Sequence, residues 1–336
     1  MKLTYEQIKS FACGAARTSE ENGRIRLYRM TQEQEEFYKE RNDFYIKALS
    51  TAGIKLVFKT DSKSLFMKVN ISKGSTRTYF SHDVFVDGKM IGSLDNYSGM
   101  EIPQAYTTID CPLGSFEKIF ELGDGEKTVC IYFPWSVASE IEEVSIDDGA
   151  FAEAVKSEKT LLAFGDSITQ GYDALKCSNL YMSRLSRMLG ADEYNKAIGG
   201  EIFFPALAKT KEAFEPDYIT VAYGTNDWST KTVDEFKTNC REFYLSLSKN
   251  YPKAKIFAIT PIWRKDYAES REFGDFVSVE QLIKELTSDL ANVYCISGFD
   301  FVPHDENYFG DLSLHPNDAG FECYAKKLYE KMKEYI

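Results

Sequence analysis

The feature that most constrains the fold is a change of rhythm near residues 150–157. From about residue 53 to 146, short runs rich in β-branched and aromatic residues follow one another without helical stretches between them. After about residue 156, similar runs alternate with helical stretches. The first pattern predicts a small antiparallel β-sandwich, jelly-roll-like in form. The second predicts a three-layer α/β unit, with a mostly parallel sheet between helices. We therefore expect two domains, residues 1–155 and 156–336.

Turn-forming residues separate the strands that we expect in the first half. Asp87-Gly88 and Gly123-Asp124-Gly125 each lie between two apolar runs, and both predict hairpin connections. Two short helices are expected before these strands, at about residues 4–11 and 32–41.

The second half predicts a regular series of strands and helices. Thr232 and Glu235 have the spacing of a capping box, and apolar residues follow at helical spacing, so a helix should begin there. The expected helices are residues 178–189, 232–249 and 318–334. The expected strands are residues 160–164, 193–198, 218–223, 255–260 and 292–297.

Composition excludes several classes of partner. The net charge is −12, and lysine and arginine do not cluster, which argues against nucleic acid or an anionic membrane as partner. No apolar run is long enough to span a bilayer. The seven cysteines show no CxxC spacing, and the first residues lack the flanks of a signal peptide. We expect a cytoplasmic protein with reduced thiols.

Polar residues follow the expected strands of the second half. In an open α/β sheet the ligand crevice lies outside the carboxyl ends of the strands, so residues that follow different strands should meet there. The candidates, in chain order, are Gly165-Asp166-Ser167, Gly199-Gly200, Gly224 to Asp227, Trp263 with Arg264, His304, and Asp311 with His315.

These residue types are the ones that acyl transfer needs. A serine hydroxyl becomes a good nucleophile when an adjacent imidazole takes its proton. A carboxylate can fix the tautomer of that imidazole and stabilise its cation. The developing oxyanion needs donors already in position, and a glycine N–H with an asparagine amide can supply them.

The blocks Gly165-Asp166-Ser167, Gly200, Gly224-x-Asn226-Asp227 and His315-Pro316 occur in the order found in the SGNH (GDSL) hydrolases, which the region 158–336 resembles. The resemblance implies Ser167 as nucleophile, His315 as base, and the Ser167, Gly200 and Asn226 groups as the oxyanion hole. Together with the sandwich, it is similar to two-domain carbohydrate esterases. It implies an esterase that removes acetyl or another short acyl group from a small or oligosaccharide ester. The sequence shows no His/Cys/Asp cluster at ligand spacing, so we expect the esterase to be metal-independent and to need no cofactor.

The sequence departs from the family pattern at the acid. Leu312 stands three residues before His315, where the family acid usually lies, and Asp311 stands four before. A bulge or a helical turn could bring Asp311 to the imidazole and complete a catalytic triad. Otherwise a backbone carbonyl would orient His315, and the enzyme would work as a Ser/His dyad. Ala197 also replaces a glycine that is common in the second block.

The choice of base and the lining of the pocket stay open at the level of sequence. His304 is a rival base, and Trp228, Trp263 and Arg264 either line the pocket or pack in the core. The chain could also be a lysophospholipase or thioesterase, or a glycan-binding protein whose hydrolase half is catalytically silent.

Overall fold

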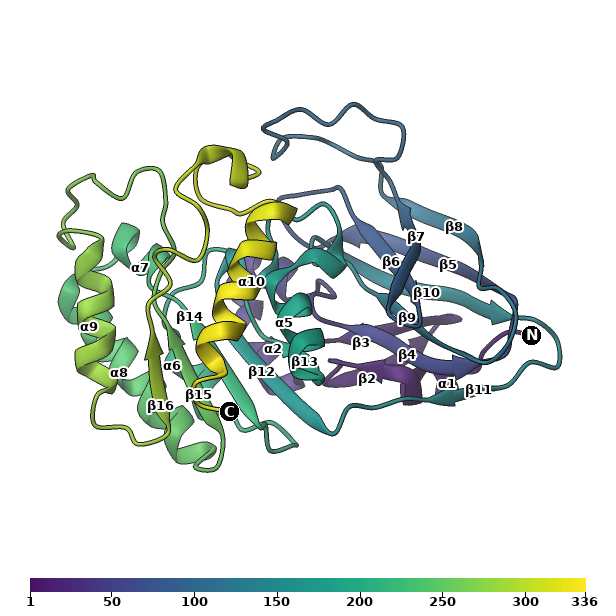
Figure 1. Cartoon of the computed structure of the whole chain (residues 1–336), viewed down its shortest axis with the longest axis horizontal. Helices are drawn as coiled ribbons and strands as arrows, with labels where there is room; N and C mark the ends of the chain where they lie inside the picture. The colour runs from purple at the N-terminus through teal and green to yellow at the C-terminus, as the bar shows by residue number, and fades with distance from the viewer.

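The computed structural model describes the backbone of all 336 residues and every side chain except that of Asn42. The strands form three sheets, two of them antiparallel and one parallel. In Figure 1 the two antiparallel sheets lie at one end of the molecule, and the parallel sheet with its helices lies at the other. The α/β unit preceded by a β-rich, sandwich-like unit confirms the predicted fold class.

The first half contains the two antiparallel sheets. Sheet A has the strand order β2-β3-β10-β5-β8, and sheet B has the order β1-β4-β9-β6-β7, with β11 paired to β4. Side chains alternate along each strand, so that Leu65, Met67 and Val69 of β5 pack against Val129 and Ile131 of β9 between the sheets. The strands are β1 Ala12–Cys13, β2 Arg17–Glu21, β3 Arg24–Tyr28, β4 Lys55–Thr60, β5 Ser64–Lys73, β6 Ser81–Val86, β7 Lys89–Asp95, β8 Gly114–Glu121, β9 Lys127–Tyr132, β10 Val137–Ile146 and β11 Ala152–Ala154.

One predicted hairpin is confirmed and the other is wrong. Asp87 and Gly88 connect the paired strands β6 and β7, and their φ values of +48° and +78° suit a tight hairpin turn. The turn at Gly123–Gly125 instead leads from β8, in sheet A, to β9, in sheet B. Turn residues favour a reversal of the chain, but they do not decide which strand the next one will pair with.

Both predicted helices of the first half are confirmed, as α1 Tyr5–Phe11 and α2 Gln32–Lys39, and each begins with a capping box. The β2–β3 hairpin and helix α3 Asn42–Ala48 were not predicted. This region contacts the second half. The buried Arg29 guanidinium donates to the carbonyl oxygens of Asn195 and Ala197, and Tyr38 of α2 packs in the core of the second half.

The second half contains the parallel sheet, which has the order β13-β12-β14-β15-β16. All five predicted strands are present, with β13 beginning two residues earlier than expected. Leu161 and Ala163 face α5 and α10, whereas Leu162 and Phe164 face α6, α8 and α9. The strands are β12 Lys159–Gly165, β13 Ala191–Asn195, β14 Tyr218–Ala222, β15 Lys255–Ile259 and β16 Val293–Ile296.

The three predicted helices of this half are confirmed as α5, α8 and α10, and α8 begins after the capping box of Thr232 and Glu235. The helices are α4 Ser167–Gln170, α5 Tyr181–Leu189, α6 Pro205–Lys209, α7 Thr225–Thr230, α8 Val233–Asn250, α9 Val277–Thr287 and α10 Asp318–Met332, with short 3-10 turns η1 Cys177–Asn179 and η2 Glu306–Tyr308.

The two halves share an apolar core. Tyr79, Tyr97 and Trp135 of the first half pack in the same cluster as Tyr181 and Tyr324 of the second.

The start of the chain is bound to the end of the sandwich, since the N–H of residue 3 donates to the carbonyl oxygen of residue 144 at 2.9 Å. No helix in the described part of the chain has both the length and the apolar character that a membrane crossing requires.

Candidate active site

Ser167 lies where the first strand of the parallel sheet ends. β12 ends at Gly165, and Ser167 begins the short helix α4. A Cβ atom at position 165 would lie 2.2 Å from Thr169 Oγ1, so this tight connection needs glycine. The Asp166 carboxylate caps α4 by accepting the Ile168 N–H at 2.9 Å, and burial raises the pKa of Asp166 to about 6. Asp166 therefore holds the turn that presents Ser167.

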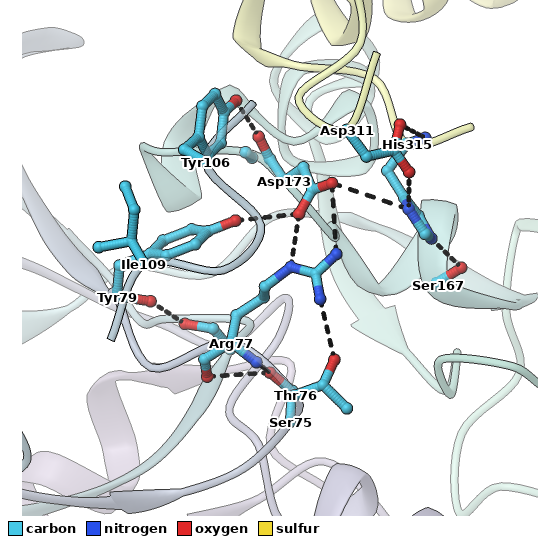
Figure 2. A network of polar contacts seen from close by, with 12 residues as sticks. Ser75, Thr76, Arg77, Tyr79, Tyr106, Ile109, Ser167, Asp173, Asp311 and His315 are labelled. Carbon is cyan, nitrogen blue, oxygen red and sulfur yellow. Dashed lines mark hydrogen bonds and ion pairs between the residues drawn. The ribbon is translucent and has the colours of Figure 1, made fainter. Parts of the chain in front are cut away.

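Ser167, His315 and Asp311 form a chain of hydrogen bonds (Figure 2). Ser167 Oγ lies 2.8 Å from His315 Nε2, and His315 Nδ1 lies 2.7 Å from Asp311 Oδ2. Ser167 is 5% exposed, so the chain is largely shielded from water. An imidazole placed in this way can take the serine proton while the carboxylate fixes its tautomer. The structure thus brings together the three residues that were predicted to meet.

A tight turn brings Asp311 to the imidazole. Leu312 has a left-handed backbone, with φ of +58°. Asp311 Oδ1 accepts the N–H groups of Ser313, Leu314 and His315 at 2.9, 2.7 and 3.1 Å. Burial alone would raise the pKa of Asp311, but the hydrogen bond and charge of His315, together with these amides, lower it to about 2. The acid is therefore held as a carboxylate by its own turn.

The loops after β13 and β14 place Gly200 and Asn226 near α4. The Gly199 N–H donates to Gln170 Oε1 of α4 at 2.8 Å, and Asn226 Nδ2 donates to the carbonyl oxygen of the residue after Gly200 at 2.9 Å. Gly200 has a φ of +85°, which favours glycine. Among the described atoms, the backbone N–H groups of Ser167 and Gly200 have no protein acceptor. Such free donors can bind a developing oxyanion.

A second carboxylate, Asp173, lies next to His315 (Figure 2). Asp173 Oδ2 is 3.7 Å from His315 Nδ1, and the Asp173 side chain is fully buried. Arg77 Nε donates to Asp173 Oδ1 at 2.8 Å, and the Tyr79 hydroxyl donates to the same oxygen at 3.0 Å. The sequence did not predict this contact. Asp173 could have been noticed because it follows Ser167 in the same polar segment, whereas nothing local marks Arg77.

Asp173, Asp311 and His315 also form a group that could hold a metal ion, because one ligand atom from each lies within 4.8 Å of the others. These atoms already have protein partners. Arg77 pairs with Asp173, and His315 Nε2 lies against Ser167. The expectation of a metal-independent site stays a prediction.

The rival histidine makes its contacts elsewhere. The His304 ring stacks on Trp263 with a centroid distance of 5.5 Å, and His304 Nε2 lies 3.1 Å from Asp300 Oδ1. Trp263 also packs against Phe309. Of the two candidate bases, His315 is the one that meets Ser167.

Trp228 and Arg264, the other candidates for lining a pocket, have structural partners. Trp228 is 1% exposed, and its indole N–H donates to the Gly274 carbonyl oxygen at 2.8 Å, which leaves little surface for a ligand. Arg264 donates to the Thr225 carbonyl oxygen at 3.1 Å and pairs with Asp266. These contacts fasten α7, the helix that carries Asn226, to the next loop.

A model of a known protein family covers most of the second half of the chain. Residues 163–323 match the model of the GDSL-like lipase/acylhydrolase family. No curated protein sequence matches the chain.

Solved structures resemble the whole chain at low sequence identity. The salicylyl-acyltransferase SsfX3, from a tetracycline biosynthetic pathway, has a TM-score of 0.79 at 18% identity, over 96% of this chain and 94% of that one. A protein described as a GDSL-like lipase from Bacteroides ovatus ATCC 8483 has a TM-score of 0.76 at 18% identity, over 99% and 97%. A family two carbohydrate esterase from Clostridium thermocellum, in complex with cellohexaose, has a TM-score of 0.64 at 17% identity, over 85% and 93%. These values show a shared fold that includes the β-rich first half.

Proposed function

Because residues 163–323 form a GDSL-like lipase/acylhydrolase domain, we propose that the protein is a serine esterase that removes short acyl groups, above all acetyl, from a carbohydrate. The observation that carries the proposal is the chain from Ser167 Oγ through His315 to Asp311, with distances of 2.8 and 2.7 Å. The likeness in fold to a carbohydrate esterase supports a sugar-borne ester as substrate.

The reaction begins when Ser167 Oγ attacks the ester carbonyl carbon and its proton passes to His315 Nε2. Asp311 stabilises the imidazolium that forms. The N–H groups of Ser167 and Gly200 and the Asn226 amide bind the oxyanion. The bond from the carbonyl carbon to the sugar oxygen then breaks, and that oxygen takes the proton from His315. Water repeats the sequence on acyl-Ser167 and releases the free acid.

A second candidate is transfer of the acyl group to an acceptor hydroxyl other than water. The fold likeness to the salicylyl-acyltransferase favours it, with a TM-score of 0.79. Both reactions would pass through the same acyl-Ser167 intermediate. They differ in what reaches it, so product analysis in the presence of a sugar acceptor separates free acid from a new ester.

The proposal is tested with p-nitrophenyl esters of increasing chain length beside fully acetylated sugars. We expect acetate esters to be the best substrates and acetylated sugars to be cleaved. Ser167→Ala should lower kcat by up to about a million-fold. The matched control is Ser288→Ala, at an exposed serine after α9, which should behave as wild type.

Three outcomes would count against the proposal. A preference for long acyl chains would indicate a lipase. Wild-type protein that binds sugar but cleaves no ester would indicate a catalytically silent glycan-binding protein. Activity of Ser167→Ala within tenfold of wild type would exclude Ser167 as nucleophile.

A further inference from the structure

The site contains more negative charge than a serine hydrolase needs. Asp311 already bonds His315 Nδ1 at 2.7 Å, yet Asp173 places a second carboxylate oxygen 3.7 Å from the same nitrogen. Opposite charges at such distances favour the protonated imidazole. A base that is already protonated cannot take the serine proton. The second carboxylate therefore needs an explanation.

Asp173 is held firmly in this position (Figure 2). Its backbone has a φ of +68°, a conformation that costs energy for a residue other than glycine. The Tyr106 hydroxyl donates to its carbonyl oxygen at 2.6 Å. A Cβ atom at Gly310 would lie 2.7 Å from Asp173 Cβ, so only glycine allows this close approach. The surroundings keep the carboxylate beside the imidazole.

The charge of Asp173 is balanced from the other half of the chain. Arg77 Nε lies 2.8 Å from Asp173 Oδ1, and Arg77 Nη2 lies 3.5 Å from Asp173 Oδ2, the oxygen that faces His315. Arg77 is only 13% exposed, so water screens this pair weakly. Arg77 and Asp173 together add almost no net charge beside the imidazole.

The remaining groups around His315 do not neutralise the charge of the Asp173 carboxylate. The Tyr172 ring packs at a tilt of 31° against His315, with a centroid distance of 5.4 Å, and burial raises the pKa of Tyr172, so its hydroxyl is neutral. The titratable and charged groups that face His315, directly or through Asp173, come from four parts of the chain: Asp311 from its own turn, Asp166, Tyr172 and Asp173 from the segment around α4, Arg77 and Tyr79 from the segment before β6, and Tyr106 from the segment between β7 and β8.

We propose that Arg77 and Asp173 are positioning residues that act as one charge-balanced pair and set the pH at which His315 becomes able to accept the Ser167 proton. The inference rests on the proposed role of His315 as base. It gives the first half of the chain a part in the reaction, because Arg77 comes from the segment that connects β5 and β6. In this proposal the pair acts through the imidazole.

The test is the pH profile of kcat/KM for acetate ester in the full-length chain. Arg77→Met leaves the Asp173 charge unbalanced and should move the acid limb to higher pH, by about one to three units. Asp173→Asn leaves the Arg77 charge unbalanced and should move the limb to lower pH. The double variant carries neither charge, and its limb should return close to that of wild type. Arg24→Met, at an exposed arginine of β3, is the matched control and should shift nothing.

The design remains decisive if Arg77→Met does not fold, as the loss of a partner in a buried pair can cause. Asp173→Asn and the double variant then suffice, because the limb of Asp173→Asn should lie below that of the double variant. Limbs that coincide with wild type in all folded variants, or that move the same way in both single variants, would overturn the inference. If Ser167→Ala is inactive while these limbs stay fixed, only this inference fails and the proposed function stands.

Discussion

Asp311 uses both of its carboxylate oxygens. Oδ2 faces His315 Nδ1, and Oδ1 accepts three backbone N–H groups of its own turn. Asp311 is one residue further from His315 than usual, and the turn compensates for this because it bends the chain at Leu312 and brings His315 next to Asp311. In the resembled family the acid usually stands three residues before the histidine. Here it stands four residues before, and the turn still brings it to the same ring nitrogen.

Replacement of Asp311 by Asn tests this arrangement. The amide oxygen can keep the three backbone bonds, which turns the NH₂ group towards His315 Nδ1. That nitrogen must then accept, so the proton moves to Nε2, the atom that should take the proton of Ser167. We expect kcat to fall by as much as about 10,000-fold, with the folded structure retained.

A matched control exists in the chain. Asp300 and His304 form another Asp–His pair at the same spacing, and Asp300→Asn should leave kcat unchanged. The measurement is kcat of both variants across pH. A loss below about fivefold in Asp311→Asn would indicate that the enzyme works as a Ser/His dyad.

The buried Asp227 should make the stability of the folded protein depend on pH. It is buried, Oδ1 accepts the Phe203 N–H at 3.2 Å, and Oδ2 has no partner among the described atoms. Burial raises its pKa to about 7, against about 3.9 in an unfolded chain. The folded state thus binds more protons between about pH 4 and 7, and this carboxyl group lowers the stability as pH rises through that window.

We therefore expect Asp227→Asn to raise Tm at pH 8 by at least about 2 °C, the shift that about 1 kcal/mol produces in a domain of this size. At pH 4, where wild-type Asp227 keeps its proton, the gain should vanish. Thermal unfolding at both pH values is the measurement, with the exposed Asp275→Asn as control. An equal gain at both pH values would show that burial of the charge is not the cause.

Chelation tests the absence of a metal. The carboxylates of Asp173 and Asp311 already pair with Arg77 and His315, so a divalent cation would have to displace protein partners. We expect esterase activity to survive exhaustive treatment with EDTA followed by gel filtration. Lost activity that returns on addition of a divalent ion would contradict the mechanism.

The site residues whose positions could be predicted from the sequence are those whose place follows from topology. Ser167, Gly200 and Asn226 follow adjacent parallel strands, and such strands end at one edge of the sheet. The contact of Arg77 with Asp173 could not be predicted in this way, because it joins residues 96 positions apart and depends on how two halves pack. The spacing of Asp311 was also ambiguous, since it depends on a left-handed residue at Leu312 that is not glycine.

At the scale of elements, α3 reaches the proposed oxyanion loop from the first half of the chain. Lys47 Nζ donates to the Gly199 carbonyl oxygen at 2.7 Å. This carbonyl belongs to the same peptide unit as the Gly200 N–H. A charged donor on the oxygen polarises that unit, so the N–H should bind an oxyanion more strongly. Lys47 is partly buried, and this burial lowers the pKa of its ammonium group.

Lys47→Met should therefore lower kcat by roughly tenfold, equivalent to about 1.4 kcal/mol, and leave KM nearly unchanged. Steady-state kinetics with acetate ester measure this effect. Lys39→Met, at an exposed lysine at the end of α2, is the control. A rise in KM at constant kcat would assign Lys47 to substrate binding instead.

Local pattern predicted elements well where a strand is apolar on both faces or a helix is apolar on one face. The strands of the parallel sheet and helix α8 are such cases. The β2–β3 hairpin was not predicted because its strands, "RTSEE" and "RIRLY", carry charged residues at half of their positions. The connection at Gly123–Gly125 was assigned to a hairpin because a turn signal contains no information about the sheet that receives the next strand.

At the scale of the whole molecule, the two halves depend on each other. The second half alone would expose the apolar surface that now packs against Tyr79, Tyr97 and Trp135. It would also lose partners of the fully buried Lys196, whose ammonium donates to the carbonyl oxygen of Arg29. Lys196 would keep its ion pair with Glu212 at 3.1 Å, but a buried charge that loses hydrogen-bond acceptors destabilises the folded state.

We expect a fragment of residues 156–336 to lack a cooperative thermal transition and to bind the apolar dye ANS. The full chain should unfold cooperatively and bind little dye. Circular dichroism and dye fluorescence of both proteins, prepared in parallel, make the comparison. A fragment that melts cooperatively and cleaves every ester as the full chain does would show that the boundary near residue 156 separates independent units.

The link between the first residues and the end of β10 has a consequence for the order in which the protein can form. The ribosome makes residue 3 long before its partner, residue 144, and Arg29 long before the carbonyl group of Ala197. The sandwich therefore cannot close during synthesis until its last long strand has emerged. Arg29 can bind its acceptor only later, when residue 197 has also emerged. Long-range pairings of this kind slow folding and prolong the exposure of apolar surface. The contact of Arg29 with Ala197 cannot form before residue 197 has left the ribosome, so the halves can dock only late in synthesis.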